Sequence, residues 1–446
     1  MKRVLAAAFV ALAAPGSASA ELVARGVSDG LVTVGPNGRA FVSYVQGENL
    51  VVARRVARGS WRREAAARVA KGSSLAAFAV GSRGPVAAIV GPNERSLYLV
   101  SRRGDRWRRT QLERRVDAGM LVGWPGLAVD HGGLPVVAYT RWRQRTRGSQ
   151  LILARVTPRG VVRTERITLN GFPESYVPPP AAPIVMPNGR IHVVETYGIS
   201  STIATIEWLP TSKSWIGQFL AGGVGDFPVG PIFGLATPAN VVYTAWTDAM
   251  IFWDEFPVTL ASHGRVINSD FLLDRALTTG LALTRAGPEV SANQWVSGTQ
   301  LGLATNAVLW AGTVTGRRGG EIDGWLDGIA AVPRADSRDL LLETPKGLSW
   351  FRLRGSMPRV SLTAEVEDDG SVMLSGRVRG ARTGGRVDVY REWPGAPRET
   401  AGTARLNAGS FSFVDSPRAK PALYRAVYTD PVTGLPVARL LREPIG

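Results

Sequence analysis

A segment of about 50 residues recurs along this chain, and this repeat constrains the fold more than any other feature of the sequence. Four copies are clear: PNGRAFVSYV (36–45), SRGPVAAIVG (82–91), HGGLPVVAYT (131–140) and PNGRIHVVET (187–196). Each is a turn followed by a strand rich in β-branched or aromatic residues. Fainter copies begin at positions 237, 285 and 336. A period of this length is typical of an array of similar supersecondary units.

Each clear copy also has the same neighbours along the chain. In the third copy, these are a strand before the turn (127–130), a third strand (150–155) and a fourth strand (161–167). Four strands per repeat is the unit of a β-propeller, and helix signals are almost absent after residue 20. The sequence therefore predicts an all-β protein with a propeller over residues 21–356, of seven blades, with six as the alternative. We expect the segment 21–27 to pair with 347–353 in the last blade. A strand from the chain start would pair with the strand edge that is otherwise left open where the ring of blades closes.

Asp130 and His131 resemble a catalytic pair, but they occupy the turn before the second strand of a repeat. Because this turn position recurs in every clear copy of the repeat, a structural role is favoured for both residues. The three histidines, at 131, 192 and 263, fall in different repeats, which argues against a histidine-based metal site or a Ser-His-Asp triad. No zinc-protease motif, phosphate-binding loop or calcium loop is present. We therefore expect no catalytic residue, no metal and no cofactor.

The chain start has the pattern of an export signal. Lys2 and Arg3 precede an apolar run over 4–14, and Ala18-Ser19-Ala20 fits a cleavage site. This pattern predicts a secreted, extracellular protein that begins at Glu21 and has no transmembrane segment. The sequence contains no cysteine, which excludes disulfide bonds and thiolate metal sites. Stability must come from large buried cores.

The blade pattern resembles a known group of proteins. The pattern consists, in order, of an apolar strand, Asp-x-x-Gly-x-Pro, Val-x-Ala-Tyr, Leu-x-x-Ala-Arg and a closing Trp. It resembles the tandem repeats of secreted bacterial β-propellers of the sialidase and Asp-box type. The resemblance extends over about residues 24–355. The Asp-box itself, Ser-x-Asp-x-Gly-x-x-Trp, is nowhere intact. The resemblance therefore implies the fold and not sialidase catalysis.

The pattern changes at Pro358, after which short segments alternate with period two. Seven short strands with turns every eight to 12 residues predict a β-sandwich of about 90 residues over 357–446. This tail resembles bacterial immunoglobulin-like or fibronectin-type modules, with Tyr424 and Tyr428 placed like tyrosines of a late core strand. Such modules serve as spacers more often than as ligand-binding units. We expect the tail to fold on its own.

Propellers bind ligands mainly on the face formed by the loops between strands two and three and between one blade and the next. These loops combine aromatic residues with carboxylates and arginines, a combination that suits sugar rings. The alternative is that the aromatic residues pack between blades. The predicted ligand-binding residues are Arg141, Trp142, Arg143, Tyr176, Tyr197, Asp226, Trp246, Asp248, Trp253, Asp254, Glu255 and Trp295.

The formal net charge of +17 is unevenly distributed. Residues 21–170 hold 26 basic and 10 acidic side chains, whereas 171–356 hold 12 basic and 16 acidic ones. GC-rich codon usage also produces arginine, but a general bias would not stop near residue 170. Clustered positive charge attracts polyanions. The predicted polyanion patch consists of Arg102, Arg103, Arg106, Arg108 and Arg109.

These observations favour a secreted, non-catalytic recognition or scaffold protein of the cell envelope that binds a glycan or an anionic polymer. The alternative is a propeller-type glycoside hydrolase or lyase, with two carboxylates about 5 to 9.5 Å apart near the central channel. Its candidate carboxylates are Glu195, Asp226, Asp248, Asp254 and Glu255. We expect a monomer and no nucleic-acid partner, because no nucleic-acid motif accompanies the arginines.

Overall fold

The computed structural model describes residues 20–143, 145–146, 148–167, 178–197, 202–209, 214–222, 227–228, 230–249, 258–262, 265–268, 276–285, 287–295, 305–311, 317–332, 336–344, 346–393, 398–416, 421–441 and 444–445. Within these ranges nearly all regular structure is β-strand, and the helical segment is the short 3-10 turn η1 (Pro92–Glu94). No helix in the described ranges has the length and apolar character needed to cross a membrane. The all-β prediction is confirmed.

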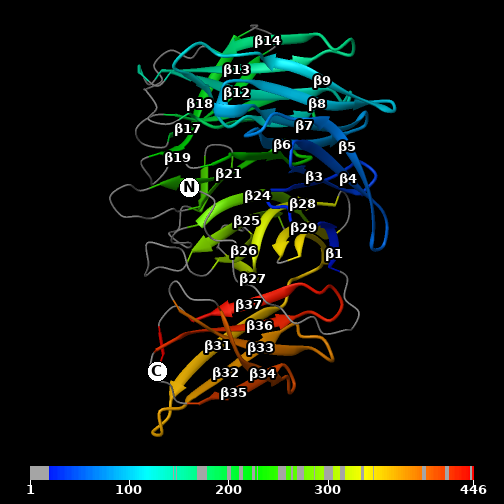
Figure 1. Ribbon diagram of the computed structural model, residues 1–446. Coiled ribbons are helices and arrows are strands. Elements are labelled where there is room, and N and C mark those ends of the chain that lie inside the picture. Colours follow the sequence, from blue (N-terminus) through cyan, green and yellow to red (C-terminus); the bar gives the residue numbers. More distant parts are fainter. Residues whose placement is uncertain are drawn as a thin grey trace.

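Seven antiparallel units, here called blades 1 to 7, follow one another in the described chain (Figure 1). Their first strands contact one another from blade to blade, so each blade runs from an inner first strand to an outer fourth strand. Blade 1 consists of β2 (Leu31–Val34), β3 (Ala40–Gln46), β4 (Asn49–Ala57) and β5 (Ser60–Arg68). Blade 2 consists of β6 (Ser74–Gly81), β7 (Gly84–Val90), β8 (Leu97–Arg103) and β9 (Arg106–Glu113).

In blades 3 and 5 the first strand is split into two short pieces that pair with the same second strand. Blade 3 consists of β10 (Met120–Val122), β11 (Gly126–Val129), β12 (Pro135–Arg143), β13 (Ser149–Val156) and β14 (Val162–Ile167). Blade 4 consists of β15 (Ala181–Val185), β16 (Ile191–Tyr197), β17 (Thr202–Leu209) and β18 (Ser214–Gly222). Blade 5 consists of β19 (Phe227–Pro228), β20 (Phe233–Ala236), β21 (Val242–Ala249), β22 (Val258–Ser262) and β23 (Arg265–Asn268).

The last two blades continue the same order. Blade 6 consists of β24 (Ala276–Thr284), β25 (Gly287–Trp295), β26 (Thr305–Ala311) and β27 (Arg317–Asp323). Blade 7 consists of β28 (Trp325–Ala331), β29 (Ser337–Thr344), β30 (Gly347–Arg354) and, as its outermost strand, β1 (Glu21–Ala24). The described chain thus forms the propeller with seven blades, not six.

The core of the propeller lies between blades, because each blade is buried on both of its faces. On β12, Val137 and Tyr139 pack toward blade 2, whereas Val136 and Ala138 pack toward blade 4. This explains why the second strands read as continuous apolar runs and do not alternate with polar residues. Apolar clusters join every consecutive pair of blades, and a further cluster joins blade 7 to blade 1.

The predicted pairing of the chain start with the last blade is confirmed. Strand β1 pairs antiparallel with β30, with Glu21 opposite Trp350 and Leu22 opposite Ser349. The Glu21 carboxylate also accepts hydrogen bonds from Arg55 of blade 1, at 2.7 and 2.8 Å. At Gly347 the backbone has φ of 116°, and a Cβ would lie 2.1 Å from the carbonyl oxygen of Ala24. A glycine there lets β1 approach the blade.

The turn that contains Asp130 and His131 has the structural role expected from the repeat. The Asp130 carboxylate accepts a hydrogen bond from the backbone N–H of Leu134 at 2.8 Å. The His131 ring contacts the carbonyl oxygen of Met186 in blade 4 at 3.0 Å through Nε2. Both residues fix the turn between two strands and its position on the next blade.

After the propeller, the tail forms two sheets that face each other across one apolar core. One sheet has the order β31 (Arg359–Val366), β32 (Val372–Arg379), β35 (Ser410–Asp415). The other has the order β34 (Glu399–Arg405), β33 (Arg386–Glu392), β36 (Leu423–Thr429), β37 (Pro436–Leu440). Tyr424 and Tyr428 are buried in the core between them. The predicted β-sandwich is therefore present.

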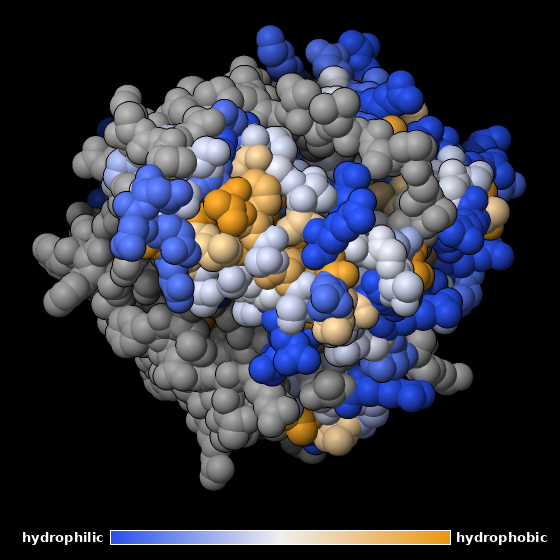
Figure 2. Space-filling view, turned by 90° about the horizontal axis from the view of Figure 1, so that it is seen from below, coloured by the Kyte–Doolittle hydropathy of each residue, from blue (hydrophilic) through white to orange (hydrophobic). Residues whose placement is uncertain are grey.

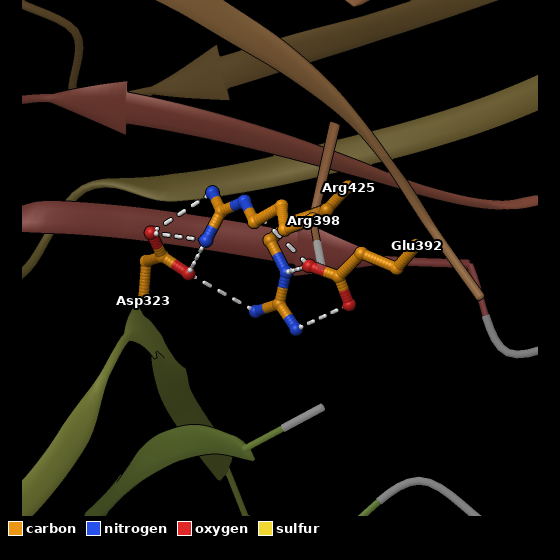
Figure 3. Close-up of polar contacts among 4 residues, drawn as sticks. All are labelled: Asp323, Glu392, Arg398 and Arg425. Carbon is orange, nitrogen blue, oxygen red and sulfur yellow. Dashed lines mark hydrogen bonds and ion pairs between the residues drawn. The ribbon is translucent and has the colours of Figure 1, made fainter. Parts of the chain in front are cut away.

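The tail is joined to the propeller by a shared sheet. Strand β37 pairs with β27, the outer strand of blade 6, with Val437 opposite Ile322. Beside this joint, Asp323 of β27 and Glu392 of β33 bind two guanidinium groups, those of Arg398 and Arg425 (Figure 3). The two parts of the chain therefore meet through both backbone pairing and buried ion pairs.

The free end of the tail is shown in Figure 2, where hydrophilic residues surround a small apolar area. The exposed large hydrophobic residues of the described tail are Val366, Val414 and Val432. Single exposed residues of this kind are common on protein surfaces and do not by themselves define an interface.

Candidate functional site

A polar cavity of about 230 Å³ opens between blades 2 and 3. It lies where β9 ends, where the chain crosses to blade 3, and where β12 turns into β13. These are the between-blade and second-to-third-strand connections on which the sequence predicted a ligand. Its lining residues are Glu113, Arg115, Val116, Asp117, Met120, Arg141, Arg143 and Gln150.

Glu113 anchors one side of this cavity. Its buried carboxylate accepts a hydrogen bond from the Tyr139 hydroxyl at 2.5 Å and from Arg141 Nε at 2.7 Å. Burial, and then the Glu113 carboxylate, raise the pKa of Tyr139, so its hydroxyl stays protonated and can donate. Arg141 is thereby fixed in position and largely neutralised. Arg141, which the sequence selected as a ligand-binding candidate, lines this cavity, whereas its partner Glu113 was not anticipated.

Two further arginines give the cavity an excess of positive charge. Arg115 and Arg143 both line it, both are exposed, and neither has an ion pair among the described residues. The lining therefore holds three arginines and two carboxylates, Glu113 and Asp117. A planar guanidinium matches the two oxygens of a carboxylate or sulfate, so this lining suits an anionic group on a ligand.

An exposed aromatic residue, Trp124, lies between β10 and β11 of blade 3 and does not itself line the cavity. Trp124 is 41% exposed and stands two residues after Val122, which pairs with Arg141. From the rise per residue along a strand and the distance between paired strands, the backbone of Trp124 is on the order of 8 Å from the backbone of Arg141. The Trp124 carbonyl accepts a hydrogen bond from Ala181 of blade 4 at 3.1 Å, which holds the segment in place. The sequence analysis missed Trp124, although its position in the Gly-Trp-Pro-Gly run at 123–126 indicates a loop and not a core strand.

The expectation that Trp142 and Trp246 form exposed platforms is wrong. Trp142 is 5% exposed, and Trp246 is fully buried between blades 4 and 5 beside Val194 and Ile232. Both lie on second strands, which are covered by the neighbouring blades. The remaining predicted residues cannot be placed at the site: Tyr176, Asp226, Trp253, Asp254 and Glu255 lie outside the described residues, and so do the side chains of Tyr197, Asp248 and Trp295.

The predicted polyanion patch lies on the β8–β9 hairpin, but its arginines differ in their surroundings. Arg102 forms an ion pair with Glu64 of blade 1 at 3.1 Å, and Arg103 donates to the carbonyl oxygen of Pro158 in blade 3 at 3.2 Å. The Arg109 guanidinium lies over the ring of Tyr98, 3.6 Å from its centroid. Arg106 and Arg108 are exposed without an ion pair in the described part of the chain. The patch therefore also serves to join blades 1, 2 and 3.

Two carboxylates that the sequence analysis did not select hold the segment that enters blade 1. Asp327 of β28 accepts a hydrogen bond from the Gly30 N–H at 3.0 Å, and Glu343 of β29 accepts one from the Asp29 N–H at 2.9 Å. Burial, and then the charge of Glu343, raise the pKa of Asp327. The described residues contain no group of three or more side chains suited to a metal ion. We assign these two carboxylates a structural role in the contact between blades 7 and 1.

Glu195 of β16 is the one candidate carboxylate of the alternative enzyme whose side chain is described. It is 4% exposed, and burial raises its pKa to about 8. A carboxyl group that is protonated at neutral pH has the property of a general acid. Because the group is almost completely covered, it does not reach the surface where a sugar would bind.

Comparisons with known proteins identify no family. No family model and no curated protein matches the sequence. Among solved structures, the Aleuria aurantia lectin complexed with α-methyl-L-fucoside is similar at 11% identity and a TM-score of 0.43, covering 66% of this chain and 94% of that one. The Swd1 β-propeller domain of Myceliophteria thermophila is similar at 12% and 0.42, covering 72% and 95%. The α-L-arabinanase of Penicillium chrysogenum complexed with arabinobiose is similar at 13% and 0.39, covering 76% and 97%. The propeller assignment rests on the seven blades themselves.

Proposed function

We propose that this protein binds an acidic glycan, without catalysis, in the cavity between blades 2 and 3. The observation that carries the proposal is the pair of arginines, Arg115 and Arg143, which line a cavity and have no ion pair among the described residues. A sugar carboxylate or sulfate would bind between their guanidinium groups. Trp124 would stack on a sugar ring further along the oligomer, because an exposed indole beside directed polar groups is a common sugar-binding arrangement.

A binding measurement with matched glycans tests this proposal. An oligogalacturonate and its neutral, carboxyl-reduced counterpart would be titrated into the protein by calorimetry. The acidic oligomer should bind and the neutral one should not. R143Q should weaken binding about 10- to 100-fold, the range of one charge-assisted hydrogen-bonded contact. R145Q is the matched control, because Arg145 is an exposed neighbour in the same connection that does not line the cavity.

Substitutions at Trp124 test the stacking part separately. W124A should weaken binding about tenfold, and W124F should retain most of it, because a phenyl ring still offers an aromatic face. Equal affinity for the acidic and neutral oligomers would overturn the recognition of a charged group. Equal affinity of R143Q and the parent protein would place the site elsewhere on the propeller.

We also infer that the protein is an exported, monomeric component of the cell envelope and that its tail is an immunoglobulin-like or fibronectin-type module. The small-residue cleavage site at 18–20 supports export. The packing of a three-stranded sheet against a four-stranded sheet supports an immunoglobulin-like or fibronectin-type tail. The pairing of β37 with β27 favours a rigid mount over a flexible spacer. Mass spectrometry of the protein from an exporting host would test cleavage after Ala20.

A further inference from the structure

Three neighbouring hairpins project from the end of the propeller opposite the cavity. They join the third and fourth strands of blades 1, 2 and 3, with turns at 58–59, 104–105 and 157–161. Figure 1 shows the first two on the same side of the molecule. The arginine contacts described above, from Arg102 to blade 1 and from Arg103 to blade 3, hold the three hairpins side by side. These three hairpins are called the hairpin face below.

Each hairpin presents an arginine at its tip. Arg58, Arg106 and Arg159 are exposed, and none has an ion pair among the described residues. The turns between first and second strands add exposed Arg39 and Arg83 at the same end of blades 1 and 2. Such a cluster attracts a negatively charged surface.

Apolar side chains accompany these charges at the tips. Val56 at the end of β4 is 47% exposed, and Val161 directly before β14 is 57% exposed. They belong to the first and third hairpins and flank the arginines of the second. A soluble polyanion offers nothing apolar for these side chains to contact. A lipid bilayer offers both an anionic headgroup layer and an apolar boundary beneath it.

We propose that the hairpin face docks on an anionic lipid bilayer. The arginines would contact headgroups, and the two valines would enter the boundary between headgroups and acyl chains. Along β9, Arg106 at the hairpin face and Glu113 in the cavity are seven residues apart, about 23 Å. Docking would therefore leave the glycan cavity facing away from the membrane. The inference does not depend on what the cavity binds.

Sedimentation with vesicles tests this docking. The full-length mature chain would be mixed with vesicles of phosphatidylcholine alone and with vesicles of phosphatidylcholine and phosphatidylglycerol in equal amounts. The protein should sediment with the mixed vesicles alone. The triple variant R58Q/R106Q/R159Q should bind them roughly 100-fold more weakly. The variant R377Q/R379Q/R405Q loses the same charge from exposed positions on the tail and should bind like the parent.

A second variant separates lipid from a soluble polyanion. V56S/V161S should bind mixed vesicles about tenfold more weakly, while its binding to dextran sulfate should equal that of the parent. Equal vesicle binding by this variant and the parent would overturn the lipid assignment, and so would the absence of binding to mixed vesicles. R143Q should bind vesicles normally, so failure of the cavity proposal and failure of this one are distinguishable. All variants would be compared by thermal melting to confirm an intact fold.

Discussion

Asp323 and Arg425 are 102 positions apart in the sequence, and Arg425 Nη1 donates a hydrogen bond to Asp323 Oδ1 across 3.2 Å (Figure 3). Arg425 is 2% exposed and also donates to Glu392 through Nε at 2.5 Å. Arg398 donates to the same Asp323 carboxylate at 2.9 Å. Burial alone raises the pKa of Asp323, but the charges of Arg398 and then Arg425 outweigh it and lower the pKa. The network is therefore ionised and connects the tail to blade 6.

Replacing Asp323 by asparagine should destabilise the joint between the tail and the propeller. The substitution leaves a buried guanidinium with half of its compensating charge, which costs about 3 kcal/mol. Because the folded-state pKa is lowered, the stabilisation is present above the ordinary aspartate pKa of about 4 and is lost as pH falls through the folded value. The melting difference between D323N and the parent should thus be large at pH 7 and shrink on acidification. D368N, at an exposed tail position, is the control; a D323N melt equal to that of D368N would contradict the role of the network.

Deleting β1 should lower the melting temperature sharply. Residues 21–24 supply buried Val23 and Ala24 and the ion pair of Glu21 with Arg55. Their loss also exposes the edge of β30. The buried apolar side chains alone contribute roughly 3 kcal/mol. The R25A variant, at an exposed position just after the strand, should melt like the parent. A deletion variant that also melts like the parent would show that β1 does not stabilise the propeller.

The repeat made the propeller predictable, whereas the joint with the tail was not. Turns such as the one at Asp130 carry a local signature, since the residue types needed for a tight turn recur in each copy. The pairing of β37 with β27 has no such signature, because any two exposed strand edges of suitable length can pair. The sequence analysis therefore treated the tail as a separate module and missed the link through Asp323 and Arg425.

The cavity was only partly predictable for a similar reason. Arg141 and Arg143 stand out in an arginine-rich segment, and the repeat places that segment at the end of the propeller where the cavity opens. Whether an aromatic side chain is exposed depends on which neighbouring blade covers it. Trp246 on a second strand is therefore buried and Trp124 in a loop is exposed, although both are tryptophans close to blade ends.

The tail should fold when expressed alone, but with reduced stability. Its own core joins both sheets and includes Leu374, Val389 and Tyr428. In isolation, β37 would lose its partner β27, and Val437 would lose its contact with Ile322. Residues 358–446 should give a cooperative melt at a lower temperature than the tail in the full-length chain. A fragment without cooperative unfolding would show that the tail requires the propeller.

Replacing Glu195 by glutamine should change how stability depends on pH. Glu195 is buried on β16 between the neighbouring strand residues Ala181 and Ala204. Burial raises its folded-state pKa to about 8, whereas the unfolded value is about 4.3. Between these pH values the folded chain holds a proton that the unfolded chain releases. The parent should therefore be most stable with respect to this group below about pH 4, and should lose that stability as pH rises toward 8.

Glutamine cannot ionise, so E195Q should not lose stability in this way as the pH rises toward 8. The variant and the parent should unfold at similar denaturant concentrations near pH 4, and E195Q should be the more stable near pH 9, by an amount on the order of 5 kcal/mol. E367Q, at an exposed position of the tail, serves as the control because its carboxylate is solvated in both states. Urea unfolding of all three proteins across this pH range is the measurement. Parallel pH profiles for E195Q and the parent would mean that Glu195 is ionised in the folded protein. Its burial would then have to be compensated by a cation.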